Sequence, residues 1–222
     1  LEDDPNAIEG IVSRLYASFA LSGPNGPGSS DISDDSGESP FLRGIINLQD
    51  FTADGMKNRW GDDGLDQLTT TSDWDANNKF FRYLYNRAYY TIPQCNNLIS
   101  ILNTSTDIPD AAEALSEARF LRSLAYFYLI DTFGKGVLAT EENLGQTDPL
   151  DYVESELLEI QPTMAPNNGY GRANKFTAAM LLAKLYMNAE VYIGESRYDA
   201  AVTYLNQVID EGGYRLADNF LE

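Results

Sequence analysis

The segment Trp74-Asp75-Ala76-Asn77-Asn78 combines an indole ring, a carboxylate and two amides within five residues. Such a set suits carbohydrate, because the C–H face of a sugar packs on an aromatic ring while its hydroxyls need directed hydrogen-bonding partners. We therefore predict Trp74 and Asn77 as ligand-binding residues, with Asn78 and the second tryptophan, Trp60, as further candidates. In the alternative interpretation of each indole, the ring folds back and plugs the core.

Groups for catalysis and metal binding are scarce in the sequence. Histidine is absent, which removes imidazole bases, the Ser-His-Asp arrangement and imidazole ligands. The single cysteine, Cys95, lies in an apolar stretch and allows neither an internal disulfide nor a thiolate cluster. A calcium loop starting at Asp31 fails, because glycine arrives one position late at Gly37 and Leu42 stands where glutamate is needed. No phosphate-binding loop or nucleophile elbow is present. We predict no catalytic activity, metal or cofactor.

Composition narrows the classes of partner. The 222 residues carry 34 acidic and 15 basic side chains, a formal net charge of −19. This charge argues against nucleic acid, whose phosphates need clustered Lys and Arg, and against an anionic lipid surface. Apolar residues make up 43% of the chain, which indicates a packed domain.

Both tryptophans lie in a long loop region, residues 23–77, that glycine and proline punctuate. Between Asp31 and Asp75 it holds 11 acidic residues against three basic ones. A loop region of this length in a compact domain is either functional or disordered, and its tryptophans favour an ordered, functional surface. The short apolar piece from Phe41 to Phe51 is predicted to dock on the core as a helical turn or two.

The rest of the chain has helical periodicity. Helices are predicted over residues 5–22, 78–103, 149–160, 175–192 and 198–210, with Pro93 kinking the second or dividing it into two. A long core helix is predicted between them, starting at residues 107–110, with Pro109 in its first turn, and ending before Gly134. Residues 117–133 are apolar nearly all round, which predicts a helix inside the core. The segment RYDAAVTYLNQVID resembles the second helix of a tetratricopeptide repeat. The predicted fold is all-α, with tetratricopeptide-like helical hairpins and a long ordered loop region.

The core helix and its turn also carry a family resemblance. The pattern EARFLRSLAYFYLIDTFG, followed by a valine at Val137 and Thr140-Glu141-Glu142, resembles the signature of the SusD/RagB family. The blocks LSGPNGPG, LQDFTADGMKNRWGD and GRANKFTAAMLLAKLY extend the resemblance over nearly the whole chain. Leu138 stands where the family usually has proline, which affects the path of the turn but not the role of the helix.

The resemblance implies a function and a location. SusD/RagB proteins are lipid-anchored to the outer membrane, exposed at the cell surface, and bind glycans beside a TonB-dependent, SusC-like transporter. It implies that residues 1–222 form one helical domain, the N-terminal portion of a longer protein, and that the lipid-modified cysteine lies outside this chain. The expected ligand is an oligosaccharide or polysaccharide, bound without catalysis. The alternative is a helical-repeat scaffold that binds a protein partner and has no sugar site.

Overall fold

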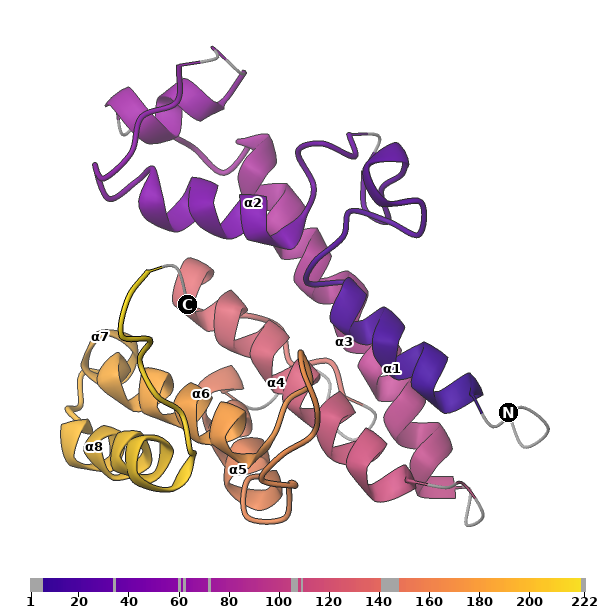
Figure 1. Cartoon of the computed structure of the whole chain (residues 1–222). Helices are drawn as coiled ribbons and strands as arrows, with labels where there is room; N and C mark the ends of the chain where they lie inside the picture. The colour runs from indigo at the N-terminus through magenta and orange to yellow at the C-terminus, as the bar shows by residue number, and fades with distance from the viewer. Residues whose placement is uncertain are drawn as a thin grey trace.

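A computed structural model describes residues 6–33, 35–59, 61, 63–71, 73–104, 108, 110–140 and 148–220 of the protein. These residues form helices and loops, with no strand longer than an isolated bridge at Ala139. The all-α prediction is confirmed. Figure 1 shows a helical scaffold with the loop region gathered at one end, beside α2 (Phe41–Ile45). Among the described helices, none is long and apolar enough to cross a membrane.

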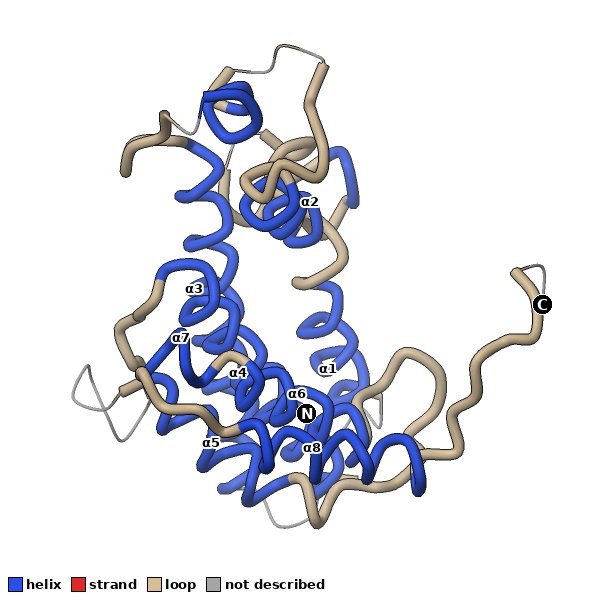
Figure 2. The backbone as a smooth tube through the Cα atoms, turned by 90° about the vertical axis from the view of Figure 1, so that its left-hand side faces the viewer, coloured by secondary structure: helices blue, strands red, loops and turns tan. Residues whose placement is uncertain are grey.

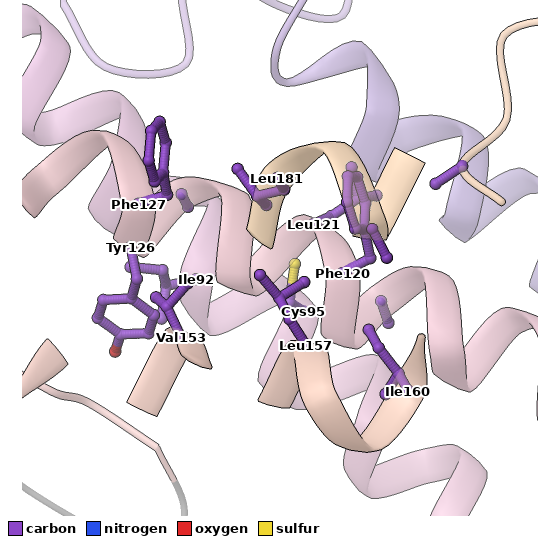
Figure 3. Close-up of a cluster of buried hydrophobic side chains, with 14 of the residues drawn as sticks. Ile92, Cys95, Phe120, Leu121, Tyr126, Phe127, Val153, Leu157, Ile160 and Leu181 are labelled. Atoms are coloured by element: carbon purple, nitrogen blue, oxygen red, sulfur yellow. The ribbon is translucent and has the colours of Figure 1, made fainter. Parts of the chain in front are cut away.

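The scaffold is built on an antiparallel hairpin of α3 (Lys79–Thr104) and α4 (Ala111–Phe133). Helix α4 is buried on almost every side, as its apolar sequence predicts, and it ends at Gly134, which takes the left-handed conformation with φ 73°. Figure 3 shows Phe120, Leu121, Tyr126 and Phe127 of α4 packed among side chains of α3, α5 and α6. Helix α3 runs continuously through Pro93, so the predicted division into two helices does not occur.

Further helices stack on this hairpin in chain order. Helix α5 (Pro149–Ile160) packs on α4, α6 (Lys175–Met187) on α5, and α8 (Tyr198–Asn206) on α6. A capping box between Asn174 and Thr177 starts α6. The single helix predicted over residues 175–192 is wrong, because the chain breaks at Asn188 and restarts as α7 (Ala189–Ile193). Gly194, with φ 73°, ends α7.

Helix α1 (Ala7–Ala17) is shorter than predicted and lies against α3 and α4. The buried carboxylate of Glu117 in α4 fixes it in place. Arg172 donates two hydrogen bonds of 2.6 Å to Glu117, and the Tyr16 hydroxyl of α1 donates a third. A buried carboxylate is stable only when its oxygens are paired in this way. Glu117 therefore joins α1 and α4 to the loop before α6.

The loop region is ordered around a small core of its own. It contains the turn η1 (Gly26–Gly28), α2, and two π-helical segments, η2 (Ile46–Asp50) and η3 (Gln67–Thr71). Seven buried side chains form this second cluster: Phe41, Leu48, Leu65, Leu68, Phe80, Tyr83 and Leu84. The predicted docking of the piece from Phe41 to Phe51 is confirmed. In Figure 2 the loop region again lies around one end of α3, away from α5 and α8.

Candidate functional site

The loop that carries Trp74 leads directly into α3. The carboxylate of Asp75 accepts a hydrogen bond of 2.7 Å from the backbone N–H of Asn77, and its carbonyl accepts one of 3.2 Å from Asn78 N–H. This local turn fixes the backbone of the loop. The Trp74 side chain is 38% exposed and Asn77 is also exposed. The loop thus presents an indole and an amide to solvent, the combination predicted for the site.

Asn78 is placed differently from its neighbour. It is 6% exposed, and its side-chain oxygen accepts from the N–H of Phe80 at 3.0 Å, which caps the start of α3. Its side-chain nitrogen donates to the carbonyl of Gly64 at 2.8 Å and to the side chain of Gln67 at 3.1 Å. Both ends of the amide are therefore engaged, and Asn78 joins the Trp74 loop to the segment around η3.

A cavity of about 260 Å³ adjoins the indole of Trp74. Phe81 of α3 and Phe133 of α4 form aromatic walls, and Leu48 of η2 adds an aliphatic one. Thr52 and Thr132 contribute side chains with hydroxyls, of which Thr132 Oγ1 is buried and has no hydrogen-bond partner among the described residues. An apolar hollow with few polar groups is the usual make-up of a small-molecule site.

One wall of this site is tied to the helical scaffold. The side-chain amide of Gln49, in η2, donates to Asp131 of α4, and the hydroxyl of Tyr192, in α7, donates to the same carboxylate. Burial, with the nearby Asp131 carboxylate, raises the pKa of Tyr192 above its ordinary value, so its hydroxyl remains a donor. The position of η2 therefore depends on two helices outside the loop region.

The other end of the loop region is held by Asp31. Its carboxylate accepts hydrogen bonds from the guanidinium groups of Arg14, at 2.6 Å, and Arg87, at 3.0 Å. Arg87 also donates to the carbonyl of Ser22 at 2.7 Å. Burial pushes the pKa of Asp31 upward, but the hydrogen bonds from the two arginines outweigh it, and the pKa lies below its usual range. In the sequence Asp31 is one acid in a run of acids, and nothing there singles it out as an anchor.

The predicted site residues therefore do not all lie in the same place. Trp74 and Asn77 share one exposed loop, whereas Asn78 lies beneath that loop. Trp60 lies outside the described residues. The lining residues Thr52 and Thr132 were not predicted, since the fold alone brings them together across 80 positions of sequence.

Comparison with known proteins shows which proteins this chain is similar to. No protein-family model matches the chain. The starch-binding protein SusD of Bacteroides thetaiotaomicron is 32% identical over 230 residues, which take in 96% of this chain and 40% of that protein. A SusD-like protein of Bacteroides ovatus is 26% identical over 60% of this chain and 28% of its own length. The chain thus spans at most about 40% of the length of these curated relatives.

Solved structures include proteins with a similar fold. One determined with a xylogluco-oligosaccharide has a TM-score of 0.75 at 20% identity, over 96% of this chain and 42% of its own. Surface glycan-binding protein A from Bacteroides thetaiotaomicron, solved with laminarihexaose, has a TM-score of 0.70 at 18% identity, over 96% and 44%. These two likenesses concern the fold. Together with the sequence similarity to SusD along nearly the whole chain, they lead to one conclusion: the chain belongs to the SusD/RagB family.

Proposed function

We propose that this chain is the glycan-binding part of a non-catalytic cell-surface protein, and that Trp74 and Asn77 contact the sugar. The observation that carries the proposal is the exposed indole of Trp74, held on a hydrogen-bonded loop beside an aromatic-walled cavity. A sugar ring would stack on the indole, and Asn77 would bond a hydroxyl. Asn78 acts indirectly, by keeping the loop in place.

The relatives support this class of ligand. One is named for starch, and two solved structures of the same fold hold a xylogluco-oligosaccharide or laminarihexaose. These ligands differ in sugar and linkage, so the proposal for this chain is an oligosaccharide without a specified linkage. By family, we further propose a lipid-anchored position at the outer membrane and delivery of the bound glycan to a TonB-dependent, SusC-like transporter.

Calorimetric titration of the chain with maltohexaose, laminarihexaose and a xyloglucan oligosaccharide tests the proposal. Trp74→Ala should weaken binding of the preferred sugar at least tenfold, because base or sugar stacking on an indole contributes about 1–3 kcal/mol. Tyr170→Ala is the matched control, since Tyr170 is a fully exposed aromatic ring on a different loop. Equal affinity in the wild type and Trp74→Ala, or turnover of any oligosaccharide, would contradict the proposal.

A protein-binding scaffold is the second candidate, and one observation favours it. Four apolar side chains are exposed on neighbouring elements: Met187 of α6, Val191 of α7, Val202 of α8 and Ile209 of the following π-helical segment η4 (Gln207–Glu211). Exposed apolar residues that lie on neighbouring elements are typical of a protein interface. Under this candidate, Val191→Asp and Ile209→Asp would weaken binding to a co-purified SusC-like transporter, whereas Trp74→Ala would leave that binding unchanged.

A further inference from the structure

Asp131, near the C-terminal end of α4, accepts hydrogen bonds from two elements that are distant in sequence. Its Oδ2 accepts from the side-chain amide of Gln49 in η2, 82 positions away. Its Oδ1 accepts from the hydroxyl of Tyr192 in α7, 61 positions away, at 2.5 Å. Figure 1 shows this end of α4 between the loop region and α7. The two oxygens of one carboxylate therefore join α7 to the loop region.

The Gln49 side of this arrangement borders the cavity beside Trp74. Leu48, the residue before Gln49, lines the cavity, and so does Thr52. The Thr52 hydroxyl donates to the backbone carbonyl of Leu48 at 2.7 Å, which ties the two lining residues to each other. A shift of Gln49 therefore carries this part of the cavity wall with it.

The Asp131 side borders the same cavity. Asp131 is followed in α4 by Thr132 and Phe133, and both line the cavity. The hydrogen bond between Gln49 and Asp131 thus connects the part of the wall on η2 to the part on α4. The spacing of these two parts depends on the orientation of the Asp131 carboxylate. Rotation of a carboxylate about χ2 is only weakly restricted, so a second partner is needed to fix it.

Tyr192 is that second partner. It is half-buried on the five-residue helix α7, packs against the main core, and does not itself line the cavity. Burial and the hydrogen bond to Asp131 raise the pKa of the phenol, which therefore keeps its proton and donates. A hydrogen bond to an ionised acceptor is stronger than one between neutral groups. The bond from Tyr192 is therefore strong enough to hold the carboxylate in one orientation.

We propose that Tyr192 is a positioning residue for the cavity beside Trp74. By holding one oxygen of Asp131, it directs the other oxygen to Gln49 and so sets the spacing of the walls on η2 and α4. Its effect on sugar affinity rests on the proposed function, whereas its effect on the walls rests on the two hydrogen bonds alone. A displacement of α7 is thereby transmitted to the cavity.

Tyr192→Phe, which removes the hydroxyl and keeps the ring, tests the proposal in the full chain. Without ligand, NMR spectroscopy should show shifted methyl resonances of Leu48 and Thr52. Calorimetry should show about fivefold weaker binding of whichever of maltohexaose, laminarihexaose and the xyloglucan oligosaccharide the wild type prefers. Tyr186→Phe is the matched control, because it removes a tyrosine–carboxylate hydrogen bond of 2.8 Å, to Glu154 of α5, away from the loop region. It should change neither measurement.

A double-mutant cycle separates positioning from a general loss of stability. Gln49→Met keeps the length of the side chain and removes its donor, so it should shift the same resonances and weaken the sugar by a similar factor. In the Gln49→Met background, Tyr192→Phe should have little further effect, because the bond through which Tyr192 acts is already absent. A purely structural contribution from Tyr192 would instead multiply the loss.

The outcomes distinguish this proposal from the proposed function. Unshifted Leu48 and Thr52 resonances in Tyr192→Phe, or losses of affinity that simply multiply in the double variant, overturn the positioning role and leave the Trp74 site standing. Shifted resonances in a chain that binds none of the three sugars support the positioning role and contradict the proposed function. Should a variant fail to fold, Asp131→Asn offers one acceptor oxygen in place of two. It should shift the same resonances, and an unchanged spectrum overturns the proposal.

Discussion

The two hydrophobic clusters of this molecule are organised in different ways. The main core is formed by long helices that pack their apolar faces together, with α4 at the centre. The apolar periodicity of each helix can be recognised in its own sequence. The second cluster has seven buried members, drawn from α2, η2, η3 with the residues just before it, and the start of α3. Its segments are short and rely on polar contacts with distant residues such as Asp31, Asn78 and Asp131. The scaffold is therefore specified locally, and the candidate binding surface is specified over long distances.

Two phenylalanines with the same burial allow the stability of the two clusters to be compared. Phe127 in the main core and Phe80 in the second cluster are each 1% exposed. Phe127→Ala should lower the free energy of unfolding by about 3–5 kcal/mol, because the close-packed helices around it cannot collapse into the cavity. Chemical denaturation followed by circular dichroism measures this change, and a loss below about 1 kcal/mol would contradict the central role given to α4.

Phe80→Ala should cost less, about 3 kcal/mol, and the loss should be local. A small cluster at the end of the scaffold can open while the main core stays folded, because few helices cross between them. Hydrogen exchange should accelerate in α2, η2 and η3 and remain slow in α4 and α5. Uniform acceleration along the chain would mean that the two clusters unfold as one unit.

Acid should also release the loop region. The folded pKa of Asp31 lies below its unfolded value, because hydrogen bonds from Arg14 and Arg87 outweigh the effect of burial. Its contribution is therefore complete above the unfolded pKa, near pH 4, and is lost as the pH falls through the folded pKa. Asp31→Asn should cost about 2 kcal/mol at neutral pH, since the hydrogen bond of Arg87 then lacks a charged acceptor. Hydrogen exchange of residues 22–39 between pH 3 and 7 measures both effects.

The scaffold has an acid-sensitive group of its own, which must be separated from Asp31. Burial raises the pKa of Glu156, but pairing with Arg119 and Arg122 lowers it by a larger amount. The pKa therefore lies below its usual value. Acid therefore also weakens the contact between α4 and α5. In Asp31→Asn the pH dependence of residues 22–39 should flatten while that of α5 persists, and an unchanged dependence in both regions would rule out Asp31 as the anchor.

This contrast explains what sequence reasoning could reach. The apolar repeat of α4 needs only its own residues, so its position and burial were predicted correctly. The sequence left open whether Pro93 kinks the helix or divides it, and the choice of one helix depends on tertiary packing, since the neighbouring side chains of Ile92 and Cys95 are fully buried. The break at Asn188 was missed for a related reason: the apolar pattern continues into α7 although the backbone does not.

At the candidate site, the exposed loop with Trp74 and Asn77 was predicted from local composition. The role of Asn78 was not, because its partners Gly64 and Gln67 lie 14 and 11 positions away. Asn47 lies in the piece from Phe41 to Phe51, which was expected to dock, but its burial at 2% exposure depends on tertiary packing that the local sequence does not show. Local sequence identifies which groups are available, and the fold decides which of them face a ligand.

The smallest expected effects distinguish two adjacent asparagines. Asn78→Ala removes the cap of α3 and the bonds to Gly64 and Gln67, so it should cost about 1–2 kcal/mol of stability. Asn77→Ala removes an exposed amide and should change stability by less than about 0.5 kcal/mol. Sugar affinity should show a different pattern. Asn77→Ala should lower it directly by the value of one hydrogen bond, about 1 kcal/mol or fivefold.

For Asn78→Ala the loss of affinity should follow the loss of loop order, and it should shrink when the sugar is present in excess, because binding stabilises the folded loop. Titration at two temperatures, one well below and one near the melting point, separates the two cases. The Asn77→Ala deficit should be the same fold-change at both, whereas the Asn78→Ala deficit should grow near melting. Identical behaviour of the two variants would mean that the Trp74 loop does not divide into a contacting residue and a supporting one.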